Sequence, residues 1–174
     1  MTEIWIIDLV SGTEEKILTI PHSIADQGRH VNDIGLSPDE QWLIIEVGNI
    51  GSEERDIYLA NLNSGDIELI LSSDVGLAPQ PWSPDGKWIV YIRDFFADPE
   101  SIFLDQEMII FNPFSDCIGE SLSLPDRFGG GFWSIDGNTI LLNMASAERN
   151  SLYFLNLEQI FGKPYTGFTC QSSD

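Results

Sequence analysis

The sequence predicts an all-β protein built from about three copies of one four-stranded antiparallel unit. Three observations predict it: two kinds of turn motif alternate along the chain, short apolar runs flank each turn, and no segment keeps an apolar stripe of helical period for a dozen residues. Hydrophobic residues make up 43% of the 174 residues, so the chain can form a packed core.

The first turn motif has the form Ser-Pro-Asp-Gly and precedes an apolar run. It begins at Ser37, Ser83 and Ser134, which are 46 and then 51 residues apart. Pro presets φ at the second position of a turn, Asp can bond to the local backbone, and Gly tolerates a positive φ. Each copy therefore predicts a β-hairpin. Two copies depart from the motif, since Glu40 replaces the Gly of the first and Ile135 replaces the Pro of the third.

The second motif is an apolar run that ends in Asp or Asn and then a Ser-Gly turn. Residues 4–12 read IWIIDLVSG, and residues 57–65 read IYLANLNSG. Weaker copies begin at Met108 and Leu152. Each copy predicts a second hairpin, so the two motifs together give four antiparallel strands per repeat. Repeats of this kind are typical of β-propeller blades, and we therefore predict a partial β-propeller of about three four-stranded antiparallel blades.

The two motifs divide the chain into the parts of a single propeller fragment spanning 1–174. We expect a half blade at 1–20, a blade at 33–72, a blade at 79–125 with an insert at 94–107, and a last blade at 130–170. Closed propellers have about four to eight blades, so a shorter stack leaves an apolar face bare at each end. We therefore expect either self-association of two chains to complete the propeller or a fragment of a longer propeller.

The middle copy of the first motif carries a family resemblance. Residues 81–91, PWSPDGKWIVY, resemble the blade signature of the TolB-like and WD-type repeat families, and the Ser-Gly element resembles the second half of that blade. The resemblance covers most of the chain. It implies a propeller and, from it, a non-enzymatic protein-binding or scaffolding module with a protein partner. The alternative is an accessory or gating propeller segment of a hydrolase such as the prolyl oligopeptidase family.

Residues that could carry chemistry are sparse, and we predict no catalytic residues. The G-x-S-x-G motif of serine hydrolases is absent. His22 and His30 lie between the first two units and are interpreted as linker histidines. Residues 129–131 are all Gly, but no Lys-Ser or Lys-Thr follows, so we interpret them as sites of close strand packing. Trp42 and Trp88 take the same position in their copies, which indicates packing between blades.

Acidic side chains gather in the predicted insert. Calcium prefers such hard oxygen ligands, but their spacing lacks the alternation and fixed Gly of a calcium loop. The side chains in question are Asp94, Asp98, Glu100, Asp105 and Glu107. We therefore interpret the insert as a solvated acidic loop or a contact loop, with Phe95 and Phe96 beside it, and predict no cofactor and no metal site.

The net charge, the short apolar runs and the two cysteines limit which partners and which cellular compartment the sequence predicts. The net charge is −20, with 28 acidic residues against 8 basic ones, which disfavours nucleic acid and anionic membranes as partners. No signal peptide or membrane-spanning run is evident, so we expect a soluble cytoplasmic protein. Export is the alternative if the N-terminus is truncated. Cys117 and Cys170 have no CxxC spacing. We interpret them as buried thiols, with a disulfide as the alternative in an exported chain.

Overall fold

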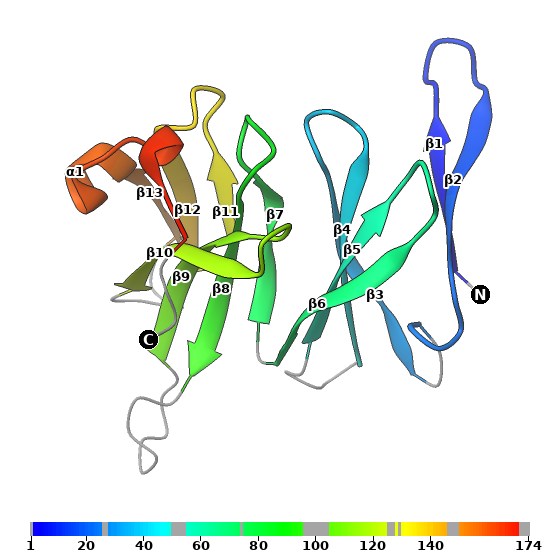
Figure 1. The fold of residues 1–174 in the computed structure, drawn as a ribbon, viewed down its shortest axis with the longest axis horizontal. Coiled ribbons are helices and arrows are strands. Elements are labelled where there is room, and N and C mark those ends of the chain that lie inside the picture. Colours follow the sequence, from blue (N-terminus) through cyan, green and yellow to red (C-terminus); the bar gives the residue numbers. More distant parts are fainter. Residues whose placement is uncertain are drawn as a thin grey trace.

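The chain folds as a row of antiparallel β-sheets standing side by side (Figure 1). The structure is a computed structural model, and it describes residues 2–25, 28–49, 55–73, 75–95, 105–124, 128, 130–145 and 150–170. These described residues form thirteen successive strands, with one short helix and one 3-10 turn near the C-terminus. The predicted all-β partial propeller is confirmed.

The strands form four successive units, which we call the first hairpin, the second blade, the third blade and the last blade. The first hairpin is β1 (Thr2–Ile7) and β2 (Glu14–Ile20), and the second blade is β3 (Arg29–Leu36), β4 (Trp42–Asn49), β5 (Arg55–Asn61) and β6 (Ile67–Ser73). The third blade is β7 (Val75–Trp82), β8 (Ile89–Phe95), β9 (Asp105–Asn112) and β10 (Cys117–Leu124). The last blade is β11 (Gly130–Trp133), β12 (Thr139–Ala145) and β13 (Asn150–Asn156).

Neighbouring blades meet at their first strands. β7 and β11 run parallel and pair where Phe132 lies opposite Gln80. Within a unit, each strand pairs antiparallel with the next one along the chain. The turns that join β1 to β2, β3 to β4, β7 to β8 and β11 to β12 all lie on the same side of the molecule, uppermost in Figure 1. The alternating turn motifs of the sequence thus become a repeated sheet.

The Ser-Pro-Asp-Gly turns keep one hydrogen-bond pattern in all three copies. The Ser hydroxyl donates to the Asp two residues later, at 2.6 Å from Ser37, 2.7 Å from Ser83 and 2.6 Å from Ser134. The same hydroxyl accepts the backbone N–H that begins the next strand. Glu40 takes a φ of 58°, close to the 73° of Gly137 at the equivalent position, so the degenerate first copy still forms the turn.

The turn carboxylates predict an acid-dependent loss of stability. The hydroxyl of Ser37 lowers the pKa of Asp39 below its usual 3.8, and that of Ser134 lowers the pKa of Asp136 in the same way, with help from backbone N–H groups. A lowered pKa in the folded state stabilises the protein above the unfolded pKa, and this stabilisation disappears as the pH falls through the folded pKa. We expect the Asp39→Asn/Asp136→Asn variant to unfold at lower urea concentration than the native chain at pH 6. The two midpoints converge as the pH falls through the lowered pKa values of the two carboxyls in the folded native chain. A gap between the midpoints that does not shrink as the pH is lowered would contradict this account.

The core is divided into three apolar layers, one between each pair of neighbouring units. Successive side chains of a strand point to opposite faces, so each blade contributes to the layer before it and to the layer after it. Ile20 and Ile45 both belong to the first layer, Leu59 and Ile109 to the second, and Ile110 and Ile140 to the third. The second blade and the third blade each separate two of these layers, so no single layer spans the described residues.

Two tryptophans bind neighbouring blades together through their indole N–H groups. Trp82 donates to the carbonyl oxygen of Gly35 at 2.9 Å, and Trp133 donates to that of Pro81 at 3.0 Å. The backbones approach closely here, since a Cβ on Gly35 would lie 2.6 Å from Cδ of Pro81. The first strands of neighbouring blades therefore pack closely at this point.

Candidate protein-binding surfaces

The repeat defines positions that face the next unit along the chain, which we call forward-facing. In the third strand of the second blade these positions are Ile57 and Leu59, and in the third blade they are Met108 and Ile110. All four side chains are at most 1% exposed, because the following blade covers them. A forward-facing position is thus a contact position wherever a next blade is present.

The last blade exposes its forward-facing residues. Leu141 pairs with Phe154 as Val90 pairs with Ile110, so Leu152 and Phe154 are the equivalents of Met108 and Ile110. Leu152 is 63% exposed and Phe154 is 73% exposed. Strand pairing places Phe132 and Leu141 on the same side of the sheet as Phe154. These four residues, Phe132, Leu141, Leu152 and Phe154, form what we call the last-blade face.

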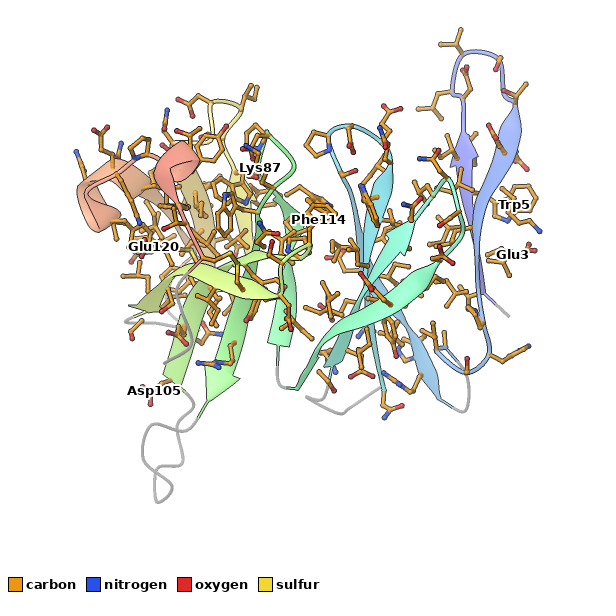
Figure 2. The ribbon with its side chains drawn as sticks, viewed as in Figure 1. Glu3, Trp5, Lys87, Asp105, Phe114 and Glu120 are labelled. Atoms are coloured by element: carbon orange, nitrogen blue, oxygen red, sulfur yellow. A yellow bond between two sulfur atoms is a disulfide. The ribbon has the colours of Figure 1, made fainter. Side chains whose placement is uncertain are left out.

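The first hairpin exposes apolar residues at the opposite end of the stack. Trp5 and Ile7 occupy the positions of Tyr58 and Ala60 in the second motif, which face the preceding unit. Trp5 is 49% exposed and Ile7 is 52% exposed, whereas Tyr58 and Ala60 are buried. Figure 2 shows Trp5 and Glu3 pointing away from the second blade. The two ends of the stack therefore present opposite halves of a blade-to-blade contact.

A hollow of about 370 Å³ lies between β1 and β3. Four residues of each strand line it, 2–5 from β1 and 31–34 from β3. Ile34 and Leu36 pair with Ile45 and Leu43, and they therefore share the face of the second blade that looks toward the first hairpin. Both side chains are more than two-fifths exposed. We call this hollow, with Ile34 and Leu36 beside it, the strand slot.

The chain follows β13 with a helix instead of a fourth strand. The side chain of Asn156 caps α1 (Leu157–Phe161) by accepting the N–H of Gln159 at 2.9 Å. Gly162, at a φ of 71°, ends the helix. The remaining segment, 162–170, crosses back to the third blade, and we call it the C-terminal strap.

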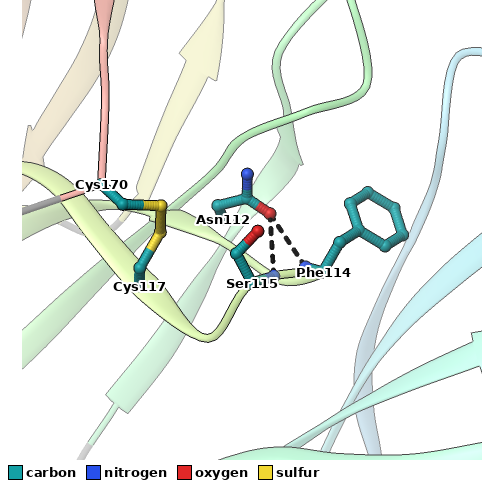
Figure 3. Close-up of a disulfide and its surroundings, with 5 residues drawn as sticks. All are labelled: Asn112, Phe114, Ser115, Cys117 and Cys170. Atoms are coloured by element: carbon teal, nitrogen blue, oxygen red, sulfur yellow. Dashed lines mark hydrogen bonds between the residues drawn. A yellow bond between two sulfur atoms is a disulfide. The ribbon is translucent and has the colours of Figure 1, made fainter.

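A disulfide between Cys170 and Cys117 fastens the C-terminal strap to the start of β10 (Figure 3). The two Cα atoms lie 5.4 Å apart, within the usual range for this bond. The interpretation of the two cysteines as buried thiols is therefore wrong. A salt bridge of 2.6 Å between Lys163 and Glu120 adds a second link from the strap to the same strand.

Aromatic side chains of the strap cover two repeat tryptophans. The ring of Phe168 lies 6.1 Å from that of Trp88, and the ring of Tyr165 lies 5.8 Å from that of Trp133. Trp88 thus packs against the strap, whereas Trp42 contacts Phe114 of the third blade at 5.1 Å. The close approach requires small residues beneath the rings. A Cβ on Gly137, for example, would lie 2.2 Å from Cε1 of Tyr165.

The residues singled out for possible chemistry do not assemble into one site. His30 lies within β3 and not in the connector, and its Nδ1 is 3.2 Å from the carbonyl oxygen of Gly28. His22 stays in the connector. A Cβ on Gly131 would lie 2.8 Å from a methyl group of Leu142, so this glycine packs against a side chain of its own blade. Gly129 lies outside the described residues.

The predicted acidic insert is described only at its ends. Residues 96–104, which include Asp98 and Glu100, lie outside the described part of the chain. Glu107 forms an ion pair of 2.5 Å with Arg93 across β8 and β9. In the part that the structure describes, no three His, Cys, Asp or Glu side chains stand close enough to hold a metal ion. No described helix is long and apolar enough to cross a membrane.

Comparison with known proteins places the fold among β-propellers. No family model matches the chain, and no curated protein matches it. TolB from Acinetobacter baumannii is similar in structure, with a TM-score of 0.63 and 18% identity over 90% of this chain and 35% of that one. A putative TolB from Agrobacterium tumefaciens has a TM-score of 0.62 and 22% identity over 90% of this chain and 52% of that one. The β-propeller domain of the Trilobed protease from Pyrococcus furiosus has a TM-score of 0.55 and 17% identity, over 88% of this chain and 46% of that one.

These similarities define the class of fold. The chain is a partial β-propeller similar to TolB proteins and to a protease propeller, and it spans only about a third to a half of their lengths. No family model supports the WD-type part of the resemblance. At identities this low, the comparisons show the fold of this chain and not its function.

Proposed function

We propose that this chain is a non-enzymatic protein-binding module that docks a β-sheet of a protein partner on its last-blade face. The observation that carries the proposal is the exposure of Leu152 and Phe154, at 63% and 73%, at positions where Met108 and Ile110 are fully buried. Burial of an exposed apolar side chain contributes about 1.5–3 kcal/mol, so the bare face favours association.

A second copy of the chain is the partner we propose first. Its first hairpin presents Trp5 and Ile7 at positions that face a preceding blade, which is the contact that the last-blade face lacks. Association would be head to tail, since the two surfaces lie at opposite ends of the stack. The alternative of an accessory propeller in a hydrolase gains no support from a specific described residue.

Disruption of the last-blade face is expected to weaken self-association by about a hundredfold. The change is Leu152→Asp/Phe154→Asp, which removes about 3 kcal/mol of apolar burial from the contact. Sedimentation velocity across micromolar concentrations measures it. Ile135→Asp is the matched control, because Ile135 is 98% exposed in a turn away from this face, and we expect it to associate like the native chain.

Two outcomes would contradict this function. A native chain that sediments as a folded monomer at every micromolar concentration would refute self-association. Turnover of any member of a panel of esters, glycosides and peptides by the purified chain would refute the non-enzymatic role.

A further inference from the structure

We propose that the disulfide between Cys117 and Cys170 is a site of reversible thiol–disulfide exchange with a dithiol reductant, and that its reduction releases the C-terminal strap from the blades. The site consists of a bond that a reductant can reach, a glycine hinge and two tryptophans that the strap covers. It is separate from the last-blade face, and its chemistry does not depend on the proposed binding function.

The bond lies where a reductant can reach it. Cys170 is exposed, and Cys117 is partly buried at the start of β10. Figure 3 shows the two sulfur atoms close to the turn between β9 and β10 that carries Ser115. Thiol–disulfide exchange requires a thiolate to approach one of the two sulfur atoms, so accessible disulfides are the labile ones. Cys170 is the more accessible residue, and we expect the attack at its Sγ.

A dithiol alone balances the reaction. One thiolate of the dithiol attacks Sγ of Cys170, the bond between the two cysteines breaks, and Cys117 leaves as a thiolate that takes up a proton. The second thiol of the reductant then loses its proton and attacks the reductant's own sulfur in the mixed disulfide, which releases Cys170 as a second thiolate to be protonated. Two electrons pass to the protein, which becomes a pair of thiols, and the dithiol becomes a cyclic disulfide.

The side chains of the strap hold it weakly compared with its length. Phe168 is the one buried residue among the nine at 162–170. The ion pair of Lys163 with Glu120 is partly exposed, with 36% of the Lys163 side chain accessible, and such pairs contribute little. Fixing the backbone of nine residues costs more entropy than the burial of one phenylalanine offsets. We therefore expect the closed strap to depend on the disulfide.

The strap can separate from the blades without disturbing its own local structure. The N–H groups of Gly167 and Phe168 donate to the carbonyl oxygens of Pro164 and Tyr165, so these bonds stay intact when the strap moves. At the start of the strap, Gly162 has a φ of 71°, and a Cβ there would meet nothing within 4 Å. Gly162 is therefore a hinge with open space around it.

The strap covers two tryptophans, and both can report its position. Phe168 lies against Trp88 and Tyr165 lies against Trp133. The two tryptophans are 5% and 8% exposed. Separation of the strap transfers one face of each ring to water. The reduced chain thus presents aromatic surface that the oxidised chain conceals.

Reduction kinetics of the full native chain test the exchange site. Dithiothreitol is the probe, iodoacetamide alkylates the free thiols at set times, and mass spectrometry counts them. We expect the rate to rise in proportion to the dithiothreitol concentration while the far-ultraviolet circular dichroism stays unchanged, because the attack occurs on the folded chain. With the monothiol glutathione, peptide mapping should find the mixed disulfide mainly at Cys170.

Chymotrypsin measures the position of the strap, since it cleaves after aromatic residues and the closed strap buries Phe168. We expect cleavage after Phe168 to be about tenfold faster in the reduced and alkylated chain than in the oxidised chain. Tryptophan fluorescence should shift to longer wavelength in the same step. The Cys117→Ser/Cys170→Ser variant should be cleaved like the reduced chain without any treatment.

Lys163→Gln is the matched control, because it removes the ion pair with Glu120 and keeps the disulfide. The oxidised Lys163→Gln chain should resist chymotrypsin like the oxidised native chain. Circular dichroism verifies that each variant is folded. The reduced native chain and Lys163→Gln give the readout if the Cys117→Ser/Cys170→Ser variant does not fold.

Four results would overturn this proposal. A reduction rate that does not change with the dithiothreitol concentration would show that the bond opens only after global unfolding. Equal cleavage of the oxidised and reduced chains after Phe168 would show that reduction does not release the strap. Oxidised Lys163→Gln that is cleaved as fast as the reduced native chain would assign the closure to the ion pair. A mixed disulfide mainly at Cys117 would contradict the expected point of attack.

Discussion

Replacement of Cys117 and Cys170 by Ser is expected to lower the free energy of unfolding by about 4 kcal/mol. The disulfide joins residues 53 apart in sequence, and a cross-link over a loop of that length removes much of the entropy of the unfolded chain. It also holds the strap, whose Phe168 is buried against Trp88. Urea unfolding followed by tryptophan fluorescence measures the change.

Reduction of the native chain provides the control for this prediction. With a reductant present, the native chain should unfold at the same urea concentration as the Cys117→Ser/Cys170→Ser variant, because both then lack the same bond. Without reductant the native chain should be the more stable of the two. Equal midpoints for the oxidised native chain and the variant would show that the disulfide contributes nothing to stability.

Replacement of Trp82 by Ala is expected to cost about 3–5 kcal/mol. The indole is buried between the second and third blades, contacts Phe114, and donates to the carbonyl oxygen of Gly35. Truncation leaves a cavity in that layer and removes the partner of the carbonyl. Trp82→Phe keeps most of the volume but loses the hydrogen bond, so it should cost about 1 kcal/mol plus a small packing term.

Trp5→Ala is the matched control for the Trp82 variants. Trp5 is half-exposed on the first hairpin, so its truncation should change the free energy of unfolding far less. Thermal unfolding by circular dichroism compares the three variants at one protein concentration below the range of self-association. A loss at Trp5 equal to that at Trp82 would contradict the assignment of the layers between blades as the main source of stability.

The strands and their turns could be predicted from the sequence because each depends on local chemistry. Ser83, Asp85 and Gly86 form the turn that their motif predicts, and the hydroxyl of Ser37 holds the equivalent turn although Glu40 replaces the Gly. The alternating apolar residues that follow then decide which face of each strand is buried. The repeat therefore predicts the sheets without any knowledge of contacts distant in the sequence.

The strap and the disulfide could not be predicted in this way, because they depend on contacts between the last and third blades. Cys117 and Cys170 carry no local motif, and only the fold brings them within bonding distance. The helix did leave a local signal, since Asn156 and Gly162 stand at the positions of a helix cap and a helix end. This helix signal competes with the weak copy of the second motif that begins at Leu152, because that copy predicts another hairpin at the same residues.

The sequence predicts that bare apolar faces exist, but it does not predict which residues form them. Spacing alone indicates that a short stack of blades has bare apolar faces, and the structure assigns one of them to Leu152 and Phe154. No pattern in the sequence indicates the strand slot. Among the described residues β1 pairs with β2 alone, and an apolar run has the same pattern whether its strand is paired once or twice.

The layered core has a consequence for how the molecule opens. The first hairpin is held to the rest by one apolar layer, whereas the opposite end is cross-linked through Cys117 and Cys170. In an array whose members touch only their neighbours, each member separates according to its own contacts. Partial unfolding should therefore begin at the N-terminal hairpin while the cross-linked blades stay intact, and the slot beside β3 would widen first.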